Sequence, residues 1–456
     1  MQLFPLVLTF VLIPLVFLGF GSILALLAKG TNSHLRTDFF ETSIYGIAGA
    51  SILVNAVYHA GFDVRVGSYI VFAVSTIGLI LYLKDNIDKK FIKINITLIW
   101  ATIWLISIAP YILGGLRVCV FQGNHYDAFN YLEAALTYRD IPHSLVSSDK
   151  LDLLTNLNGF PIAVRNYVRP AFSILVGMFS LIKETSFLAI APAIVNFAIF
   201  CTSGIICKIL QISLISAKRY EGITFGSVFC LGFWGQYIQD INAWSQAIWT
   251  PVLMLVVFNL LKYLPISTEY KYNKPNDTIN CIIWTILISA LIYLYPEGTI
   301  FSLPSLVIVY TMIVLLRKNY SKDFKLTLTV LIITTILCTF VWKECVMQEI
   351  HITKVASSSV KDSDAWKFYD AYIATAYQHG SNLLESIGSA IISSIGLYFL
   401  VTNNWFSPLL IKCISWLGIL IFALIAQNII RSIFKKNKMR LPRINGQGLG
   451  YKNHIT

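Results

Sequence analysis

The sequence predicts an all-α polytopic membrane protein that crosses the bilayer about 11–12 times. Apolar residues make up 56% of the 456-residue chain, and its mean hydropathy is +0.68. Charged residues are only 13% of the chain, whereas a soluble domain carries about 25%. Aromatic residues stand at the ends of many apolar runs, as in the aromatic belts of membrane interfaces. A chain of this composition needs lipid as part of its solvent.

Each predicted span is an apolar run of roughly the 20 residues that a helix needs to cross a bilayer. The candidate spans are 3–28, 42–61, 67–83, 95–115, 187–210, 222–238, 246–263, 279–295, 298–316, 325–342, 386–402 and 408–430. The first run lacks a basic start and is longer than the apolar part of a signal peptide, so we interpret it as a transmembrane helix. Span 386–402 is short and rich in Ser and Gly; without it the chain crosses eleven times.

The basic residues predict the orientation, because short cytoplasmic loops are enriched in Lys and Arg. One set of short loops contains sixteen Lys and Arg and comprises 29–41, 84–94, 208–220, 262–278 and 317–325. The alternate set contains only Arg65 and comprises 62–66, 239–245 and 296–297. We therefore expect the first set in the cytoplasm. The N-terminus and the long loops 116–186 and 343–385 are then outside, and the basic tail favours eleven crossings.

The chain divides into four predicted parts. They are three N-terminal transmembrane helices (1–94), a membrane core with the first outer loop 116–186 (95–343), a second outer loop (344–385), and C-terminal membrane segments with a basic cytoplasmic tail (386–456). The net charge of +12 is explained by basic loops beside anionic lipid, so no nucleic-acid partner is expected.

The first outer loop contains the main candidate for chemistry, Asp127. Apolar residues follow it at helical spacing, at Ala128, Tyr131, Leu132, Ala135 and Leu136. This spacing predicts an amphipathic helix on the membrane surface. A carboxylate at its start can act as a general base or hold a divalent metal at the lipid–water boundary. The alternative is a plain helix cap, since Asp is favoured there.

A second apolar helix, 171–182, is led by Arg169-Pro170 and precedes the span 187–210. The order of basic cytoplasmic loop, span, outer loop with an early Asp, surface helix, Pro-led helix and span resembles the membrane glycosyltransferases of the GT-C fold, which use polyprenyl-phosphate sugars. The resemblance covers roughly 95–343. It implies a GT-C-like fold with juxtamembrane helices in the outer loop, and it matches Asp127 to the functional Asp of that class.

Further site residues are expected on the same outer face. Asp240 matches the second acidic position that the resemblance implies, and its alternative is a solvated loop residue. Glu297 lies in a very short turn between two apolar runs and can hydrogen-bond an acceptor sugar. Basic and imidazole groups suited to substrate and its phosphate are His125, Arg165, Arg169 and Lys343. The alternative role of these basic residues is snorkelling to lipid headgroups.

The resemblance implies an inverting glycosyltransferase. Asp127 would deprotonate the acceptor hydroxyl, and Arg169 would stabilise the departing lipid phosphate. The partners would be a polyprenyl-phosphate-linked sugar, a glycan acceptor such as bacterial O-antigen, and the bilayer of an inner membrane, with the site facing the periplasm. Two alternatives stay open. One is a lipid-linked glycan polymerase or ligase that relies on His143, Arg165 and Arg169; the other is a flippase or transporter, which the nearly uncharged spans disfavour.

Overall fold

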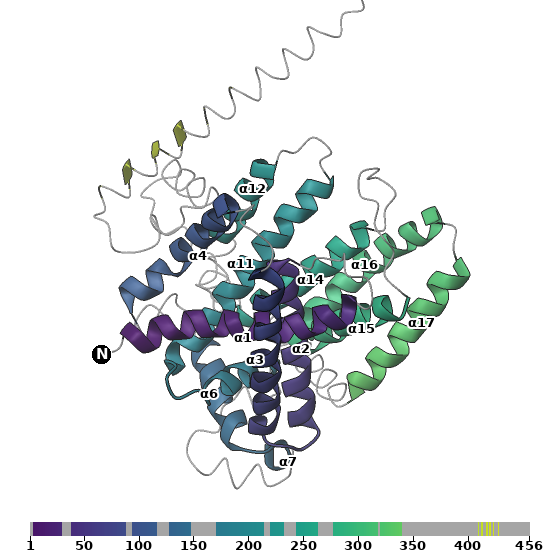
Figure 1. Cartoon of the computed structure of the whole chain (residues 1–456), viewed down its shortest axis with the longest axis horizontal. Helices are drawn as coiled ribbons and strands as arrows, with labels where there is room; N and C mark the ends of the chain where they lie inside the picture. Colours follow the sequence, from purple (N-terminus) through teal and green to yellow (C-terminus); the bar gives the residue numbers. More distant parts are fainter. Residues whose placement is uncertain are drawn as a thin grey trace, which may run out of the picture.

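The structure of the chain is a computed structural model (Figure 1). It describes residues 3–29, 38–87, 94–115, 127–146, 170–213, 219–231, 243–262, 277–317, 320–339 and isolated positions between 409 and 427. The helices are α1 (Leu3–Lys29), α2 (Phe39–His59), α3 (Val64–Ile87), α4 (Ile94–Gly114), α6 (Asp127–Asp140), α7 (His143–Val146), α10 (Pro170–Phe179), α11 (Phe187–Ser213), α12 (Arg219–Leu231), α14 (Trp244–Lys262), α15 (Asp277–Leu294), α16 (Pro296–Arg317) and α17 (Tyr320–Leu337). Every regular element in these ranges is a helix.

The expected membrane architecture is confirmed at the level of its helices. Each predicted span from 3–28 to 325–342 overlaps a described helix, although residues 232–238 of span 222–238 and 340–342 of span 325–342 lie outside the described residues. The spans 386–402 and 408–430 lie outside the described residues except for isolated positions. Within the described ranges, six helices are long and apolar enough to cross a membrane. They are α1, α2, α3, α11, α14 and α16. This architecture is compatible with a polytopic integral membrane protein.

Local sequence explains where several helices begin. Asp38 caps α2 by accepting a hydrogen bond from the Glu41 backbone N–H at 3.1 Å. Pro170 and Pro296 are the first residues of α10 and α16, a position where the missing N–H of proline costs no helical hydrogen bond. Prolines also lie inside helices, for example Pro14 of α1, Pro192 of α11, Pro251 of α14 and Pro304 of α16, and membrane helices tolerate them more readily than soluble ones.

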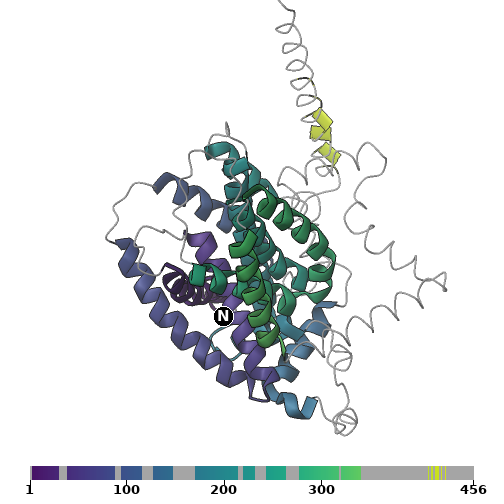
Figure 2. The same cartoon turned by 90° about the vertical axis from the view of Figure 1, so that its right-hand side faces the viewer.

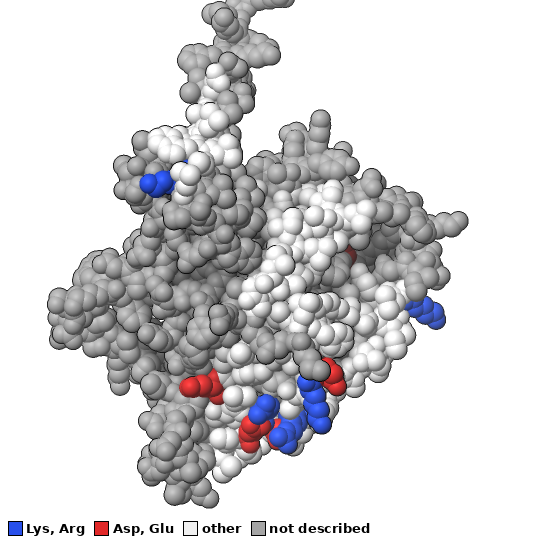
Figure 3. Space-filling view, turned by 90° about the vertical axis from the view of Figure 1, so that its left-hand side faces the viewer, with Lys and Arg blue, Asp and Glu red and all other residues white. Residues whose placement is uncertain are grey.

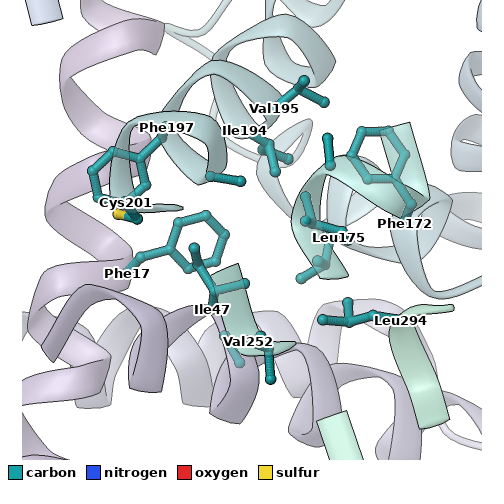
Figure 4. Close-up of a cluster of buried hydrophobic side chains, with 14 of the residues drawn as sticks. Phe17, Ile47, Phe172, Leu175, Ile194, Val195, Phe197, Cys201, Val252 and Leu294 are labelled. Carbon is teal, nitrogen blue, oxygen red and sulfur yellow. The ribbon is translucent and has the colours of Figure 1, made fainter. Parts of the chain in front are cut away.

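Helix α11 is the centre of the described bundle. In its most apolar stretch, 94% of the residues of α11 are buried, whereas in that of α16 only 11% are buried. Helix α11 is therefore surrounded by protein, and α16 lies at the periphery. Figure 4 shows part of this core, where Phe17 of α1, Ile47 of α2 and Leu175 of α10 belong to one buried cluster with Phe197 of α11. The N-terminal helices therefore pack directly on the core that follows residue 95.

Helix α1 crosses α2 and α3 steeply. Figure 1 shows α1 lengthwise, and Figure 2 shows it end-on while α3 lies lengthwise. Glycines allow the close approach: a Cβ at Gly21 or Gly46 would meet backbone atoms across the α1–α2 contact, and one at Gly19 or Gly78 would meet backbone across the α1–α3 contact. Small residues permit such backbone contact between membrane helices.

Loops predicted to share one side of the membrane meet in the structure. At one end, Lys208 Nζ of α11 lies 2.5 Å from Glu41 Oε1 and 2.5 Å from Asp38 Oδ2 at the start of α2. These residues belong to the predicted cytoplasmic loops 29–41 and 208–220. At the other end, the Tyr58 hydroxyl donates to the Ile141 carbonyl oxygen at 3.1 Å, which joins the last turn of α2 to the first outer loop. The structure thus agrees with the predicted grouping of these loops.

Charges on one face of the molecule gather at the second end. In Figure 3 most visible described charges lie along the lower part of the molecule, where Figure 1 shows α6, α7 and the α2–α3 turn. The described surface above them on this face is largely uncharged, as a bilayer-facing surface must be.

We expect cysteine labelling to assign the two ends to the two sides of the membrane. A Cys at Ser148 should react with an impermeant maleimide added from outside, and a Cys at Lys89 should react only after permeabilisation, because the basic loops stay in the cytoplasm. The measurement is the amount of label incorporated above that of the unsubstituted chain, because that chain already has eight cysteines. Labelling of Lys89→Cys in intact cells, without labelling of Ser148→Cys, would show that the orientation is opposite to the predicted one.

Candidate functional site

A cluster of aromatic and polar side chains surrounds the first turns of α14. We call it the α14 cluster; its members are Tyr131, Phe172, Trp244, Ser245, Gln246, Trp249, Tyr295 and Thr299. These residues come from α6, α10, α14 and the α15–α16 corner. The cluster therefore joins four chain segments that are far apart in the sequence.

Three aromatic rings form one half of the α14 cluster. The ring centroids of Tyr131 and Phe172 lie 5.4 Å apart, and Trp244 lies 5.5 Å from each of them. The Ser245 hydroxyl donates to the Tyr131 hydroxyl oxygen at 3.2 Å. Tilted and edge-to-face ring contacts at these separations are favourable, so the starts of α6, α10 and α14 are held together.

Hydrogen bonds to the α15–α16 corner form the other half. Gln246 Nε2 donates to the Tyr295 hydroxyl at 2.9 Å, and Trp249 Nε1 donates to Thr299 Oγ1 at 3.0 Å. The Thr299 hydroxyl is in turn within hydrogen-bond distance of the Leu291 and Tyr295 carbonyl oxygens. Such polar groups satisfied within apolar helices fix one arrangement of the corner.

Among the residues expected to serve glycosyl transfer, Glu297 is the one whose side chain the structure describes. It is the second residue of α16 and only 5% exposed. The favourable field of a helix N-terminus for a carboxylate helps to explain its place there. Its neighbour Gly298 lies against the Tyr295 and Trp249 rings, where a Cβ would collide with Tyr295. Glu297 thus belongs to the corner that the α14 cluster holds.

The other expected residues flank members of the same cluster along the chain. Asp127 is the first residue of α6 and stands one helical turn before Tyr131, which confirms the predicted helix start. Arg169 directly precedes Pro170 and is three residues before Phe172. Asp240 is four residues before Trp244. The Asp127 side chain and the residues His125, Arg165, Arg169, Asp240 and Lys343 lie outside the described part of the structure.

The predicted amphipathic helix is confirmed as a helix, with a different buried face. Its buried side chains are Tyr131, Leu132, Ala134, Ala135 and Tyr138. Leu136, expected on this face, is 37% exposed instead. The reason is packing on α10, where Gly177 lies against the Ala135 carbonyl and the Arg139 side chain. The apolar side of α6 is therefore covered in large part by protein.

His143 lies at the opposite end of α6 from Asp127. The two are sixteen residues apart, and α6 alone accounts for 14 of them, a helix about 20 Å long. His143 packs instead on His59 and Tyr58 of α2. Among the described residues no group of three or more His, Cys, Asp or Glu side chains is arranged to hold a metal ion.

Sequence reasoning did not single out the polar members of the α14 cluster. A faint signal existed, because Gln246 and Trp249 stand three residues apart near the outer end of a predicted span and share one helix face. Their partners Tyr295 and Thr299 became evident only in three dimensions.

Comparisons with protein-family models, curated proteins and solved structures found no match to this chain.

Proposed function

We propose that this protein is a membrane glycosyltransferase that moves a sugar from a polyprenyl-phosphate donor to a surface or lipid-linked glycan on the outer face of the membrane. The α14 cluster is the observation that supports it. Tyr131, Phe172 and Trp244 touch one another, and Gln246, two residues after Trp244 on α14, donates to Tyr295. Each of these four aromatic residues lies within four residues of one of Asp127, Arg169, Asp240 and Glu297. Four residues of chain reach at most about 14 Å.

The helix starts around this cluster suit a phosphorylated donor. Helices α6, α10, α14 and α16 all begin at or beside the α14 cluster. Helix N-termini carry partial positive charge and unpaired backbone N–H groups, which favour anions such as phosphate. In the proposal, Arg169 at the start of α10 adds a guanidinium that can bind phosphate oxygens in a bidentate manner.

The proposed reaction divides the remaining roles among the carboxylates. Asp127 accepts the proton of the acceptor hydroxyl, whose oxygen then attacks the anomeric carbon and inverts it. The bond from that carbon to the donor phosphate oxygen breaks, and Arg169 stabilises the released lipid phosphate. Asp240 orients the acceptor or a divalent metal, and Glu297 hydrogen-bonds a sugar hydroxyl at the buried corner.

The site would also be open to lipid-borne substrate from the side. Neighbouring helices present large apolar side chains outward, such as Phe301 of α16, which is 82% exposed. A polyprenyl tail needs such a hydrocarbon surface beside the site, whereas its phosphate needs the interface. We place the reaction on the periplasmic face of a bacterial inner membrane.

The experiment that tests this function is glycan mass analysis of cells with the gene and cells from which it has been deleted. Surface glycans and lipid-linked glycans are extracted and weighed by mass spectrometry. Loss of one sugar mass per repeat unit is the expected result. Loss of long chains with intact repeat units would instead identify a polymerase or ligase. Unchanged glycans in both fractions would overturn the proposal.

A further inference from the structure

Three charged side chains meet where α2 begins and α11 approaches its end. We call them the Lys208 triad; its members are Asp38, Glu41 and Lys208. Lys208 Nζ lies 2.5 Å from Glu41 Oε1, 2.5 Å from Asp38 Oδ2 and 5.5 Å from the centre of the Phe258 ring of α14. One ammonium group therefore binds α2 through two carboxylates and α14 through a cation–π contact. Nothing in the proposed reaction uses these residues.

The triad is shielded from water to a large extent. The Lys208 and Glu41 side chains are 20% and 12% exposed, and Asp38 is the more exposed partner. The Asp38 carboxylate also accepts the Glu41 backbone N–H at the start of α2, so it is fixed in place. An ammonium group has three N–H donors and can bind both carboxylates at once. Ionisable groups in the membrane domain of a protein are costly and usually have a function.

Deeper in the bundle, α2 and α11 are in close contact. Gly204, one helical turn from Lys208, lies against the Phe40 ring, with which a Cβ at this position would collide. Phe40 in turn packs on Trp100 of α4, with ring centroids 4.8 Å apart. Cys201 follows on the same face of α11, about 10 Å along the helix from Lys208, and is fully buried. A charged layer, an aromatic layer and a buried thiol thus follow one another along this junction.

The interior behind these layers contains polar groups that water would solvate. Thr42 and Ser43 of α2 and Thr202 and Ser203 of α11 are all fully or almost fully buried. Thr42 Oγ1 has no hydrogen-bond partner within the described part of the chain. A buried hydroxyl with an open hydrogen-bonding position is a ready site for water. Exclusion of water from this interior therefore depends on how the helix ends are closed.

We propose that the Lys208 triad is a seal that closes this end of the bundle to water and ions at the α2–α11 junction. The ammonium holds both carboxylates against α11, so that Phe40 stays over Gly204. Without it, two like charges at the start of α2 repel each other and gain by contact with bulk water, which draws this end of α2 away from α11. The inference does not depend on the proposed glycosyl transfer or on which side of the membrane this end faces.

The reaction of Cys201 with a maleimide tests the seal. The full-length protein is labelled in lipid nanodiscs, where reagent reaches both membrane faces, and tandem mass spectrometry measures each cysteine separately. Cys201 should react slowly in the unsubstituted protein and roughly tenfold faster in Lys208→Met, because loss of one partner leaves partly buried charges unpaired. Cys338, which is fully buried in α17, is the internal reference; it should stay unreactive, and its labelling marks a variant as unfolded.

Two further variants separate the charges from the side chains. Glu41→Lys with Lys208→Glu exchanges two charges and keeps the net charge, so Cys201 should again react slowly. Asp38→Asn with Glu41→Gln removes both carboxylate charges but keeps the α2 cap, because Asn caps a helix about as well as Asp. It should expose Cys201 as Lys208→Met does, and it takes the place of that variant if Lys208→Met does not fold. Slow reaction of Cys201 after removal of the charges, or fast reaction after their exchange, would overturn the seal.

Discussion

The Asp127→Asn variant should reach the membrane at normal levels and lose product formation by roughly 10²–10⁴-fold. An amide cannot accept the proton of the acceptor hydroxyl, so a catalytic base fails after this change. A capping residue does not fail, because Asn caps a helix about as well as Asp. The substitution therefore separates the two roles of the first residue of α6.

The measurement is the amount of glycan product, normalised to the membrane level of each variant. Glu133→Gln is the matched control, because Glu133 is an exposed carboxylate on the same helix and the change also removes one negative charge. It should leave product formation within a factor of about two, as expected of surface substitutions away from a site. Normal product from Asp127→Asn would make Asp127 a helix cap and would remove the main support for glycosyl transfer.

The Gly78→Val variant should lower the free energy of unfolding by about 3 kcal/mol, near the upper end for overpacked sites. A Cβ at Gly78 would meet the backbone carbonyl of Gly19 and the Ile23 side chain. A flexible side chain can move aside, whereas the backbone of α1 moves only with the whole helix. Relief of the clash thus requires α1 to separate from α3.

Denaturation of the purified protein in detergent micelles measures this effect. Ala73→Val, an exposed position on the same helix, adds a β-branched side chain without a helix contact. Its stability should change by less than about 0.5 kcal/mol. Equal stability of Gly78→Val and the unsubstituted protein would mean that α1 and α3 do not cross at this point.

The sequence could predict the helices because lipid imposes a simple rule of length and apolarity on each segment separately. Spans such as 187–210 and 279–295 agree with α11 and α15 within a few residues. The burial of α6 was harder to predict. The spacing of its apolar residues pointed to Leu136, but contact with Gly177 of α10 selected Ala134 and Tyr138 instead. Periodicity identifies an apolar face, and the partner helix decides which edge of that face is covered.

The sequence suggests candidate site residues one at a time, and the α14 cluster near four of them could not be predicted from it. Asp127, Arg169, Asp240 and Glu297 follow from positions at span ends, where each can be judged alone. The contact between α14 and the α15–α16 corner depends on Gln246 and Tyr295, whose hydrogen bond joins residues 49 positions apart. The steep crossing of α1 could not be predicted either. Gly19 lies against α3 and Gly21 against α2, and no sequence pattern shows which glycine contacts which helix.

The steep crossing of α1 and α3 bears on how the long helix α1 fits into a bilayer. Its 27 residues make a helix about 40 Å long, whereas the hydrocarbon layer is about 30 Å thick. A helix that is too long for the layer fits by leaning, and this excess corresponds to a lean of about 40°, the upper limit seen for membrane helices. Helices α1 and α3 cross steeply at Gly19 and Gly78, so they cannot both stand upright in one bilayer, and the extra length of α1 lets it lean and still span the hydrocarbon layer.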